Sequence, residues 1–516
     1  MNKGVMVARL MVWAGMAVFF IVPLLFVAFR GLMQSDWSSV QDVSLILVAT
    51  LSQALWSTAV AVCIAVPIAW AVTVVPGRAA QWVLLWVAVP FIIPTPVAAV
   101  LLQSVCGPQT WCGALFGIEV AQGFVFVVLV QAWYNIGLIV RVVTPAWVAI
   151  RGTYSGVAAT LGAPSWRQLT SITIPLLTPS MLNGALLVLL YCIGSFGVIV
   201  LLGGGRIVSL EVEIWRQTSQ YLRLDRATVL ALVQLGISIV VLRAVDGFVL
   251  PRPIAAIVYR RPANAGWVRW LAMCIIGLAV FVFVLPYGAL AVRSFAGSDP
   301  FAALRALQDP VRGSGMSISP LMSLLRSLWI ATCVTGISMA IAWIATTPGT
   351  RLRSAVVLPL GVSTITLGLG YLLWFGTLGW LTSPWLLIAV HCVVVLPLVT
   401  RQLMVGRDRL PAQYAAAAQT LGATPLRRVW NIEVPLLRRT ISAAASLAYA
   451  LSLGDYAAAF VLSRPDSATA PVIIARLLNR PGATSYAQAA ALSLVFVVCC
   501  VVVMVIVQRA AADQDD

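Results

Sequence analysis

The sequence predicts an all-α membrane protein with twelve transmembrane helices in two duplicated six-helix halves, and three observations support this prediction. Of the 516 residues, 61% are hydrophobic and only 9% are charged, whereas charged residues make up about a quarter of a soluble globular domain. Apolar stretches long enough to span a bilayer recur along the whole chain. One polar segment also occurs twice, at an offset of 260 residues (154 to 414).

Twelve apolar stretches are each long enough to cross a membrane as a helix, which rises about 1.5 Å per residue. The first follows Lys3 and Arg9. Because no small-residue cleavage site follows it cleanly, we interpret it as an uncleaved first helix rather than a signal peptide. The expected spans are 10–28, 51–75, 80–104, 121–149, 177–202 and 229–250 in the first half, and 269–292, 324–346, 355–376, 384–405, 440–463 and 487–508 in the second.

The basic residues indicate the orientation of these spans. With the N-terminus inside, 21 of the 33 Lys and Arg residues fall on the cytoplasmic side and 12 outside, which is the bias that the positive-inside rule requires. We therefore attribute the net charge of +17 to topology and not to nucleic-acid binding. Both termini are expected in the cytoplasm, with a first half at 1–250, a cytoplasmic connector at 251–268 and a second half at 269–516.

The composition excludes several kinds of chemistry. Lys3 is the only lysine and His391 the only histidine. A phosphate-binding P-loop and a Schiff-base lysine are thus ruled out within the membrane body, and a histidine metal cluster is not expected. We expect no catalytic residue, metal or cofactor on this chain. The energy for its function must come from a partner.

The duplicated segment occupies 154–177 and 414–437, and 11 of its 24 aligned positions are identical. Each copy has an Ala-rich first part, then a glycine (Gly162 or Gly422), then a proline close to the next apolar stretch. This pattern predicts a short helix, a break at the glycine, a second short helix and a fresh start at the final proline. We call each copy an elbow.

The elbows resemble the coupling loop of binding-protein-dependent ABC importer permeases, and the fusion of both halves resembles the thiamine and ferric-ion importers. The loop pattern is Glu-Ala-Ala, three residues, Gly, nine residues, Ile, one residue, Leu-Pro. The positions that match are Ala158, Gly162, Ile172 and Pro175 in the first copy and Ala417, Ala418, Gly422, Ile432 and Pro435 in the second. The opening Glu is absent from both copies, which carry Gly156 and Ala416 there.

The resemblance implies a type I ABC importer permease fold in the inner membrane of the cell. It also implies two copies of a cytoplasmic ATPase subunit, each holding one elbow and binding ATP and Mg²⁺, and a periplasmic substrate-binding protein. The residues expected to couple to the ATPase are Ala158, Gly162, Arg167, Ile172, Pro175, Ala418, Gly422, Arg427, Ile432 and Pro435.

In such permeases the helices after the elbows line the solute cavity. Two matched stretches are therefore expected on the translocation path, Gly194-Ser195-Phe196-Gly197 and Gly454-Asp455-Tyr456-Ala457. An ionisable side chain within a span costs about 2.5–3.5 kcal/mol on insertion scales and normally faces an aqueous or protein interior. We expect Asp455 to be a gate or a cation-attracting group, with Ser195, Phe196 and Tyr456 beside it. The alternative is an Asp that packs between helices and is hydrogen-bonded to backbone or a hydroxyl.

Three further features each have two interpretations. His391 either makes a structural hydrogen bond between helices or acts as a ligand, and the structural interpretation is favoured. Cys106 and Cys112 lie in an external loop where they form a disulfide or remain free thiols. The external loops 206–228 and 464–486 carry mixed charge, which suits docking of a two-lobed binding protein or simple solvation.

The sequence thus predicts a permease subunit, not an enzyme, that passes a small solute from a binding protein to the cytoplasm. The phrases at 201–205 and 452–455 resemble the thiamine type. A ferric ion or another small solute is the alternative. A secondary transporter of the major facilitator type is the main rival from another class, but Asp455 is nearly alone as a coupling group in the spans. A membrane-embedded enzyme lacks the necessary His, Lys and clustered carboxylates.

Overall fold

The structure is a computed structural model that describes residues 3–33, 43–75, 77–107, 110, 122–247, 266–295, 301–309, 318–347, 352–464, 466–480 and 482–512. Every regular element within these ranges is a helix, which confirms the all-α prediction. Most of the predicted connector and Cys112 lie outside the described residues, so the connector stays a prediction and both interpretations of Cys106 and Cys112, disulfide and free thiols, stand as before.

Within the described residues, nine helices are long and apolar enough to cross a membrane, as expected for a multi-pass membrane protein. They are α1 (Lys3–Met16) joined through a π turn to α2 (Val22–Met33), α3 (Val43–Val74), α7 (Phe124–Ile150), α10 (Ile174–Ile193), α13 (Leu224–Gly247), α14 (Gly266–Ser294), α16 (Pro320–Ala345), α19 (Pro384–Asp408) and α25 (Ala483–Ala512).

Two of the predicted continuous spans are broken by prolines. The stretch 80–104 forms α4 (Arg78–Ala88) and α5 (Thr95–Cys106), which are bent by 117° with respect to each other. The stretch 355–376 contains only the shorter helix α18 (Thr364–Thr377), after a 3₁₀ turn that begins around Pro359. Proline lacks the backbone N–H of a helix interior and restricts the residue before it. Helix α4 therefore ends before Pro90, and α5 and α18 begin only after Pro94 and Pro359.

The predicted spans 177–202 and 440–463 are also wrong as continuous helices. Helix α10 ends at Ile193 and α11 (Gly197–Leu202) follows, while α22 (Val434–Gly454) is followed by α23 (Ala457–Leu462). Asp455 has an extended backbone, with φ −71° and ψ 118°. Glycine weakens a helix interior, and glycines occur at both sites. We call residues 194–196 the first break and residues 455–456 the second break.

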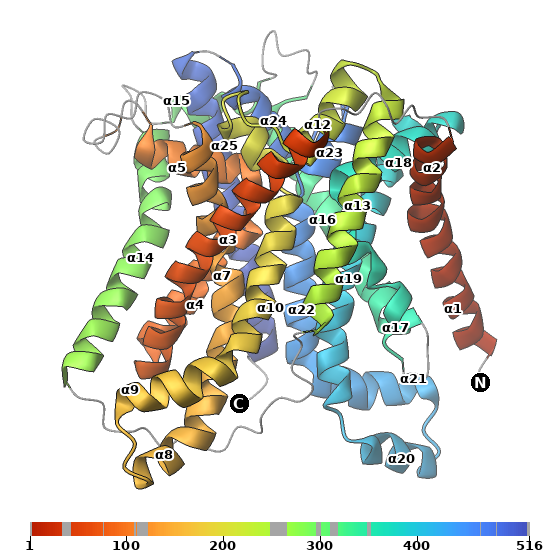
Figure 1. The fold of residues 1–516 in the computed structure, drawn as a ribbon. Helices are drawn as coiled ribbons and strands as arrows, with labels where there is room; N and C mark the ends of the chain where they lie inside the picture. Colours follow the sequence, from red (N-terminus) through yellow and green to blue (C-terminus); the bar gives the residue numbers. More distant parts are fainter. Residues whose placement is uncertain are drawn as a thin grey trace.

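Both elbows lie at the same end of the molecule, here called the elbow end (Figure 1). The first elbow contains α8 (Gly156–Thr160) and α9 (Ser165–Gln168), and the second contains α20 (Ala412–Thr420) and α21 (Pro425–Arg428). The N and C marks are also toward this end, whereas α12 (Leu210–Trp215) and α24 (Ala470–Leu478) lie at the opposite end.

The fresh start expected at Pro175 and Pro435 does not occur. Residues Trp166–Ile193 form one helix of 28 residues, and in the second elbow α21 continues through a π turn (Val429–Glu433) into α22. A proline removes one donor and displaces the carbonyl four residues earlier, and the wider π turn before each proline accommodates this. The second part of each elbow is therefore rigidly joined to the helix that ends at a break.

The first helix of each sequence half packs on helices of the other half. Helix α2 packs on α18, and α14 packs on α3, α4 and α5. Phe19 stacks on Phe375 with ring centroids 5.7 Å apart, and the Tyr371 hydroxyl donates to the Phe19 carbonyl at 2.6 Å. On the other side Trp133 stacks on Phe283 at 5.8 Å. The two halves thus hold each other together.

The matched loops at the opposite end contain short buried helices. Glu211 in α12 is fully buried and Glu213 is 9% exposed. Gln234 donates to Glu211 at 2.6 Å and Gln217 donates to Glu213 at 2.5 Å. Simple solvation is therefore wrong for these two carboxylates, whereas Arg206 and other charges of the loops are exposed.

Candidate translocation site and coupling elbows

The two elbows have the same backbone geometry. Gly162 and Gly422 have φ values of +74° and +73°, the left-handed region in which glycine is favoured. The next N–H reaches back across the turn in both, from Ala163 to the Ala158 carbonyl at 3.0 Å and from Ala423 to the Ala418 carbonyl at 2.9 Å. This six-to-one bond identifies a Schellman cap, so the glycine ends one helix and sets the direction of the next.

The remaining predicted elbow residues differ in exposure. Ala158 and Ala418 are buried, Ile172 and Ile432 are half-buried, and Arg167, Arg427, Pro175 and Pro435 are exposed. The two arginines are thus available to a partner. The alanines and isoleucines are less accessible, and the coupling role of all these residues stays a prediction.

Each elbow also presents a leucine that sequence reasoning did not single out. Leu161 is 81% exposed and Leu421 is 86% exposed, each directly before the turn glycine, and Trp166 and Trp430 are exposed by 66% and 64%. Exposed apolar groups gathered at one place mark contact surfaces. The available signal was the identical Thr-Leu-Gly sequence in both copies.

The second elbow is fastened to its own half by Glu433. One carboxylate oxygen lies 2.8 Å from Arg407 Nη2 and the other lies 3.0 Å from Arg428 Nε. Arg407 also lies over the Trp343 ring, 4.0 Å from its centroid, and donates to the Trp343 carbonyl at 2.8 Å. In the first elbow the aligned residue is Thr173 (433 minus 260), whose hydroxyl bonds the Gln168 carbonyl at 3.2 Å. The two elbows are therefore anchored differently.

We expect Glu433→Gln to destabilise the folded chain by about 1–3 kcal/mol. This is less than the 3–5 kcal/mol of breaking a fully buried pair, because the Glu433 side chain is 16% exposed. Thermal unfolding of the protein in lipid nanodiscs measures the effect. Arg167→Gln, on the exposed face of the first elbow, is the control. An unchanged melting temperature for Glu433→Gln would show that the ion pairs do not fasten the elbow.

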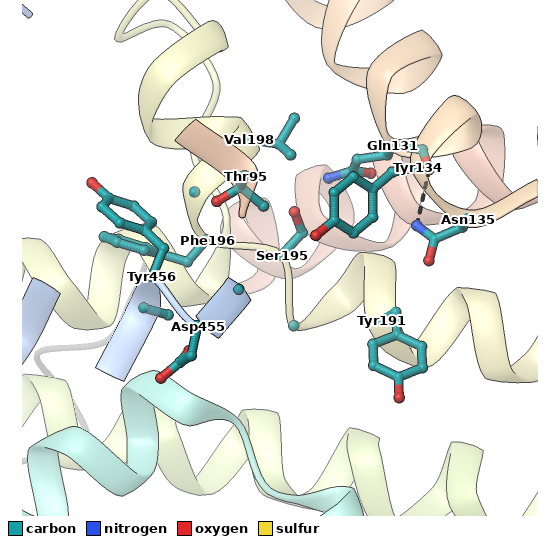
Figure 2. Close-up of a pocket in the computed structure, with 14 residues that line it drawn as sticks. Thr95, Gln131, Tyr134, Asn135, Tyr191, Ser195, Phe196, Val198, Asp455 and Tyr456 are labelled. Carbon is teal, nitrogen blue, oxygen red and sulfur yellow. Dashed lines mark hydrogen bonds between the residues drawn. The ribbon is translucent and has the colours of Figure 1, made fainter. Parts of the chain in front are cut away.

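The two breaks meet at one cavity of about 160 Å³. All four residues predicted for the path line it (Figure 2), Ser195 and Phe196 from the first break and Asp455 and Tyr456 from the second. The first half adds further polar and aromatic side chains, namely Thr95, Gln131, Tyr134, Asn135 and Tyr191. The structure therefore brings together residues that are 260 positions apart in the sequence.

The breaks touch through aromatic residues at matched positions. Phe196 and Tyr456 (196 plus 260) stack with ring centroids 5.8 Å apart and an interplanar angle of 21°. Glycines let both breaks lie close to their neighbours. A Cβ at Gly197 would lie 2.8 Å from Tyr456 Cδ1, and a Cβ at Gly454 would lie 2.9 Å from the Ile92 carbonyl oxygen. The stacked pair closes one wall of the cavity.

Several polar atoms at the cavity have no hydrogen-bond partner among the described residues. They are Gln131 Nε2, Asn135 Oδ1 and Tyr456 Oη, all of them buried. Buried polar groups are normally satisfied by protein, water or ligand. Water or a polar solute can therefore satisfy these atoms.

Asp455 lies against the single histidine. His391 Nε2 is 3.0 Å from Asp455 Oδ2, and the two side chains are 2% and 9% exposed. His391 Nδ1 lies 3.2 Å from the Ser452 hydroxyl. The first contact is short but does not have the direction of a regular hydrogen bond. The interhelical role expected for His391 is thus found, and Asp455 is a bound partner of His391.

A second cavity of about 120 Å³ lies nearer the elbow end and shares Tyr191 with the first. Both sequence halves line it, with Arg141 from α7 and Leu398 and Leu447 from α19 and α22. Arg141 is exposed although it lies within a long apolar helix. Charged groups in spans face water-filled or protein interiors, and here Arg141 lies at a cavity whose other lining residues are mostly apolar.

The comparisons with known proteins agree with this geometry. No family model matches the chain. The chain is 25% identical over 498 residues to the thiamine transport system permease protein ThiP of Brucella abortus (strain 2308), covering 90% of this chain and 87% of the relative. It is 25% identical over 417 residues to ThiP of Escherichia coli (strain K12), covering 77% and 76%.

A third relative has a different solute in its name. The chain is 30% identical over 205 residues to a probable sulfate transport system permease protein of Chlorokybus atmophyticus, covering 39% of this chain and 71% of the relative. All three relatives are named as permease proteins of transport systems, which are not enzymes themselves. Together with the paired elbows, these likenesses show that the chain belongs to the permease subunits of ABC importers.

Proposed function

We propose that this chain forms the membrane pathway of an ATP-driven thiamine importer in the inner membrane, with both termini in the cytoplasm. Its halves, 1–250 and 269–516, would each supply six spans. The nine long helices support this together with the bent pair α4–α5, the shorter α18 and the broken pair α22–α23, because these elements occupy the twelve expected positions.

Two ATPase subunits act on the elbows in this proposal, one on each, and bind the ATP and Mg²⁺. The exposed Leu161 and Leu421 and their neighbouring tryptophans are the surface that they hold. The helix Trp166–Ile193 has 28 residues and is about 42 Å long at 1.5 Å per residue. A displacement of the elbow is transmitted along this helix to the first break, and α21–α22 does the same for the second.

A periplasmic binding protein delivers the solute at the opposite end. The exposed charges there, such as Arg206, Arg223, Asp225 and Arg464, support docking because they surround the short buried helices α12 and α24. The solute then enters between the breaks, passes the Phe196–Tyr456 pair and leaves through the cavity that contains Arg141.

The observation that carries the thiamine assignment is the Asp455 carboxylate among aromatic side chains at the first cavity. Thiamine is a small aromatic cation, and it is the solute in the names of the relatives that cover most of this chain. An anion such as sulfate would be repelled by the carboxylate. No group of three or more His, Cys, Asp or Glu side chains gathers within the described residues.

Uptake into proteoliposomes tests this proposal. The permease is reconstituted with its ATPase, and the binding protein is added outside with labelled thiamine, sulfate or ferric citrate. ATP-dependent accumulation of thiamine alone is expected. Accumulation of sulfate or iron in place of thiamine would overturn the solute assignment while leaving the importer assignment intact.

The elbow surface leads to a separate prediction. Leu161→Ser combined with Leu421→Ser is expected to reduce the amount of ATPase that co-purifies with the permease by at least about fivefold, because two apolar anchors of about 1.5–3 kcal/mol each are removed. Leu222→Ser, at a leucine that is 75% exposed in the loop 206–228, is the control. Equal co-purification of all variants would exclude the leucines from the contact.

A further inference from the structure

We propose that His391 is the partner of Asp455 when the path is empty and that an aromatic organic cation takes its place there during passage. His391 would then be a positioning residue that decides which solutes Asp455 accepts. The inference rests on the proposed function, since it concerns the same cavity, and it assigns a role to a residue that the sequence alone marks as structural.

The carboxylate is held on the side away from the cavity. Asp455 lines the cavity and His391 does not. Figure 2 shows the carboxylate turned away from Ser195 and Tyr134, and the contact with His391 Nε2 is 3.0 Å. The Ser452 hydroxyl, 3.2 Å from Nδ1, holds the other side of the ring. The imidazole therefore reaches Asp455 from behind, while the cavity in front of it stays open.

This arrangement stabilises the Asp455 carboxylate, whose burial in a membrane protein costs free energy. A carboxylate in the middle of a membrane protein needs a cation or hydrogen-bond donors, and the His391 imidazole is the ionisable group that lies against Asp455, 3.0 Å from Oδ2, while no solute is present. A solute can draw Asp455 away from His391 only if it compensates for the lost contact. A positive ring does so through its charge and through stacking on Tyr456, Phe196 or Tyr134, since cations are attracted to aromatic faces. A neutral or anionic solute does not.

The duplication supplies an internal comparison. At the offset of 260 residues, His391 aligns with Gln131 and Asp455 with Ser195. Gln131 accepts a hydrogen bond from Ser57 at 2.8 Å. The first break carries the uncharged Ser195 at the position that aligns with Asp455. The first half therefore keeps the polar architecture without the charge. The histidine and the carboxylate occur together in the second half only.

The proposed exchange predicts that a substitution of His391 strengthens solute binding instead of weakening it. His391→Gln places in the second half the residue found in the first, and removes the competitor for Asp455. Binding of thiamine and of N-methylpyridinium, a simple aromatic cation, should become at least about threefold tighter. Asp455→Asn should weaken both at least about tenfold. Equilibrium dialysis on the permease–ATPase complex in nanodiscs measures both constants. If His391 were only structural, His391→Gln would bind equally or more weakly.

The single histidine allows a direct observation. In a complex assembled from permease with ¹⁵N-labelled histidine and unlabelled ATPase, solid-state NMR detects His391 alone. Both cations should shift the imidazole resonances in the wild type and leave them unchanged in Asp455→Asn. Unchanged resonances in the wild type under conditions where dialysis shows binding would overturn the exchange, and so would a failure of both cations to bind.

The outcomes separate the two proposals. A response to N-methylpyridinium but not to thiamine would support the exchange and overturn thiamine as the solute. ATP-dependent thiamine uptake with an unresponsive imidazole would overturn the exchange and leave the importer function standing.

Discussion

Replacement of Gly162 or Gly422 by valine is expected to lower ATP-dependent uptake at least about tenfold while the chain still inserts and the ATPase still hydrolyses ATP. Both glycines have positive φ, +74° and +73°, and an added Cβ would meet no atom within 4 Å. The penalty is therefore conformational, about 1–2 kcal/mol for an ordinary residue in the left-handed region, and a β-branched residue pays more. We expect the elbow to relieve this strain by changing the angle between its two short helices, which displaces the surface that the ATPase subunit holds.

A matched control is available for this experiment. Gly379 has φ +71° and equally open surroundings, but it follows α18 at the other end of α19 from the second elbow. Gly379→Val imposes the same backbone strain without touching an elbow. Uptake and ATPase rates are measured together for the three variants. A loss of uptake of the same size in Gly379→Val would mean that strain itself, and not the elbow angle, is responsible.

Asp455→Asn is expected to reduce thiamine uptake at least about tenfold, whereas Ser195→Ala should change it less than about twofold. The amide keeps the shape of the side chain but removes the charge that we assign to the solute and to His391, which lies 3.0 Å away. Loss of a charge-assisted contact costs about 1.5–3 kcal/mol, in line with a tenfold effect. Ser195 lines the same cavity without a charge.

Initial uptake rates in the reconstituted system, normalised to the amount of inserted permease, measure this difference. Small and equal effects at the two positions would favour the alternative in which Asp455 only packs between helices. Restored uptake in Asp455→Glu would argue that the charge is what matters.

Much of the architecture was predictable because it depends on composition and repetition. The apolar stretches indicated the membrane helices, and the two copies at 154–177 and 414–437 indicated the elbows, since only glycine suits the turn at Gly162 and Gly422. The same offset placed Phe196 opposite Tyr456, and these rings do stack. Repeated sequence thus indicated which residues would meet.

The rest depends on tertiary contacts that no local pattern contains. Hydropathy averaged over a span does not distinguish a straight helix from one broken at residues 194–196 or 455–456, because two or three residues change the average little. Continuity of the elbow with α10 depends on a π turn before Pro175, which proline alone did not indicate. The contacts of Glu433 with Arg407 and of His391 with Asp455 join residues 26 and 64 positions apart (433 minus 407 and 455 minus 391).

The most direct test of the account is the distance between the two elbow tips during the ATP cycle. Spin labels carried on unnatural amino acids at positions 161 and 421, which avoid the native cysteines, report this distance by pulsed electron paramagnetic resonance in the permease–ATPase complex. We predict a shorter distance when the complex is trapped with ATP than without nucleotide, and no change in the permease alone. The same distance in both states of the complex would contradict the claim that a separate motor moves the path through the elbows.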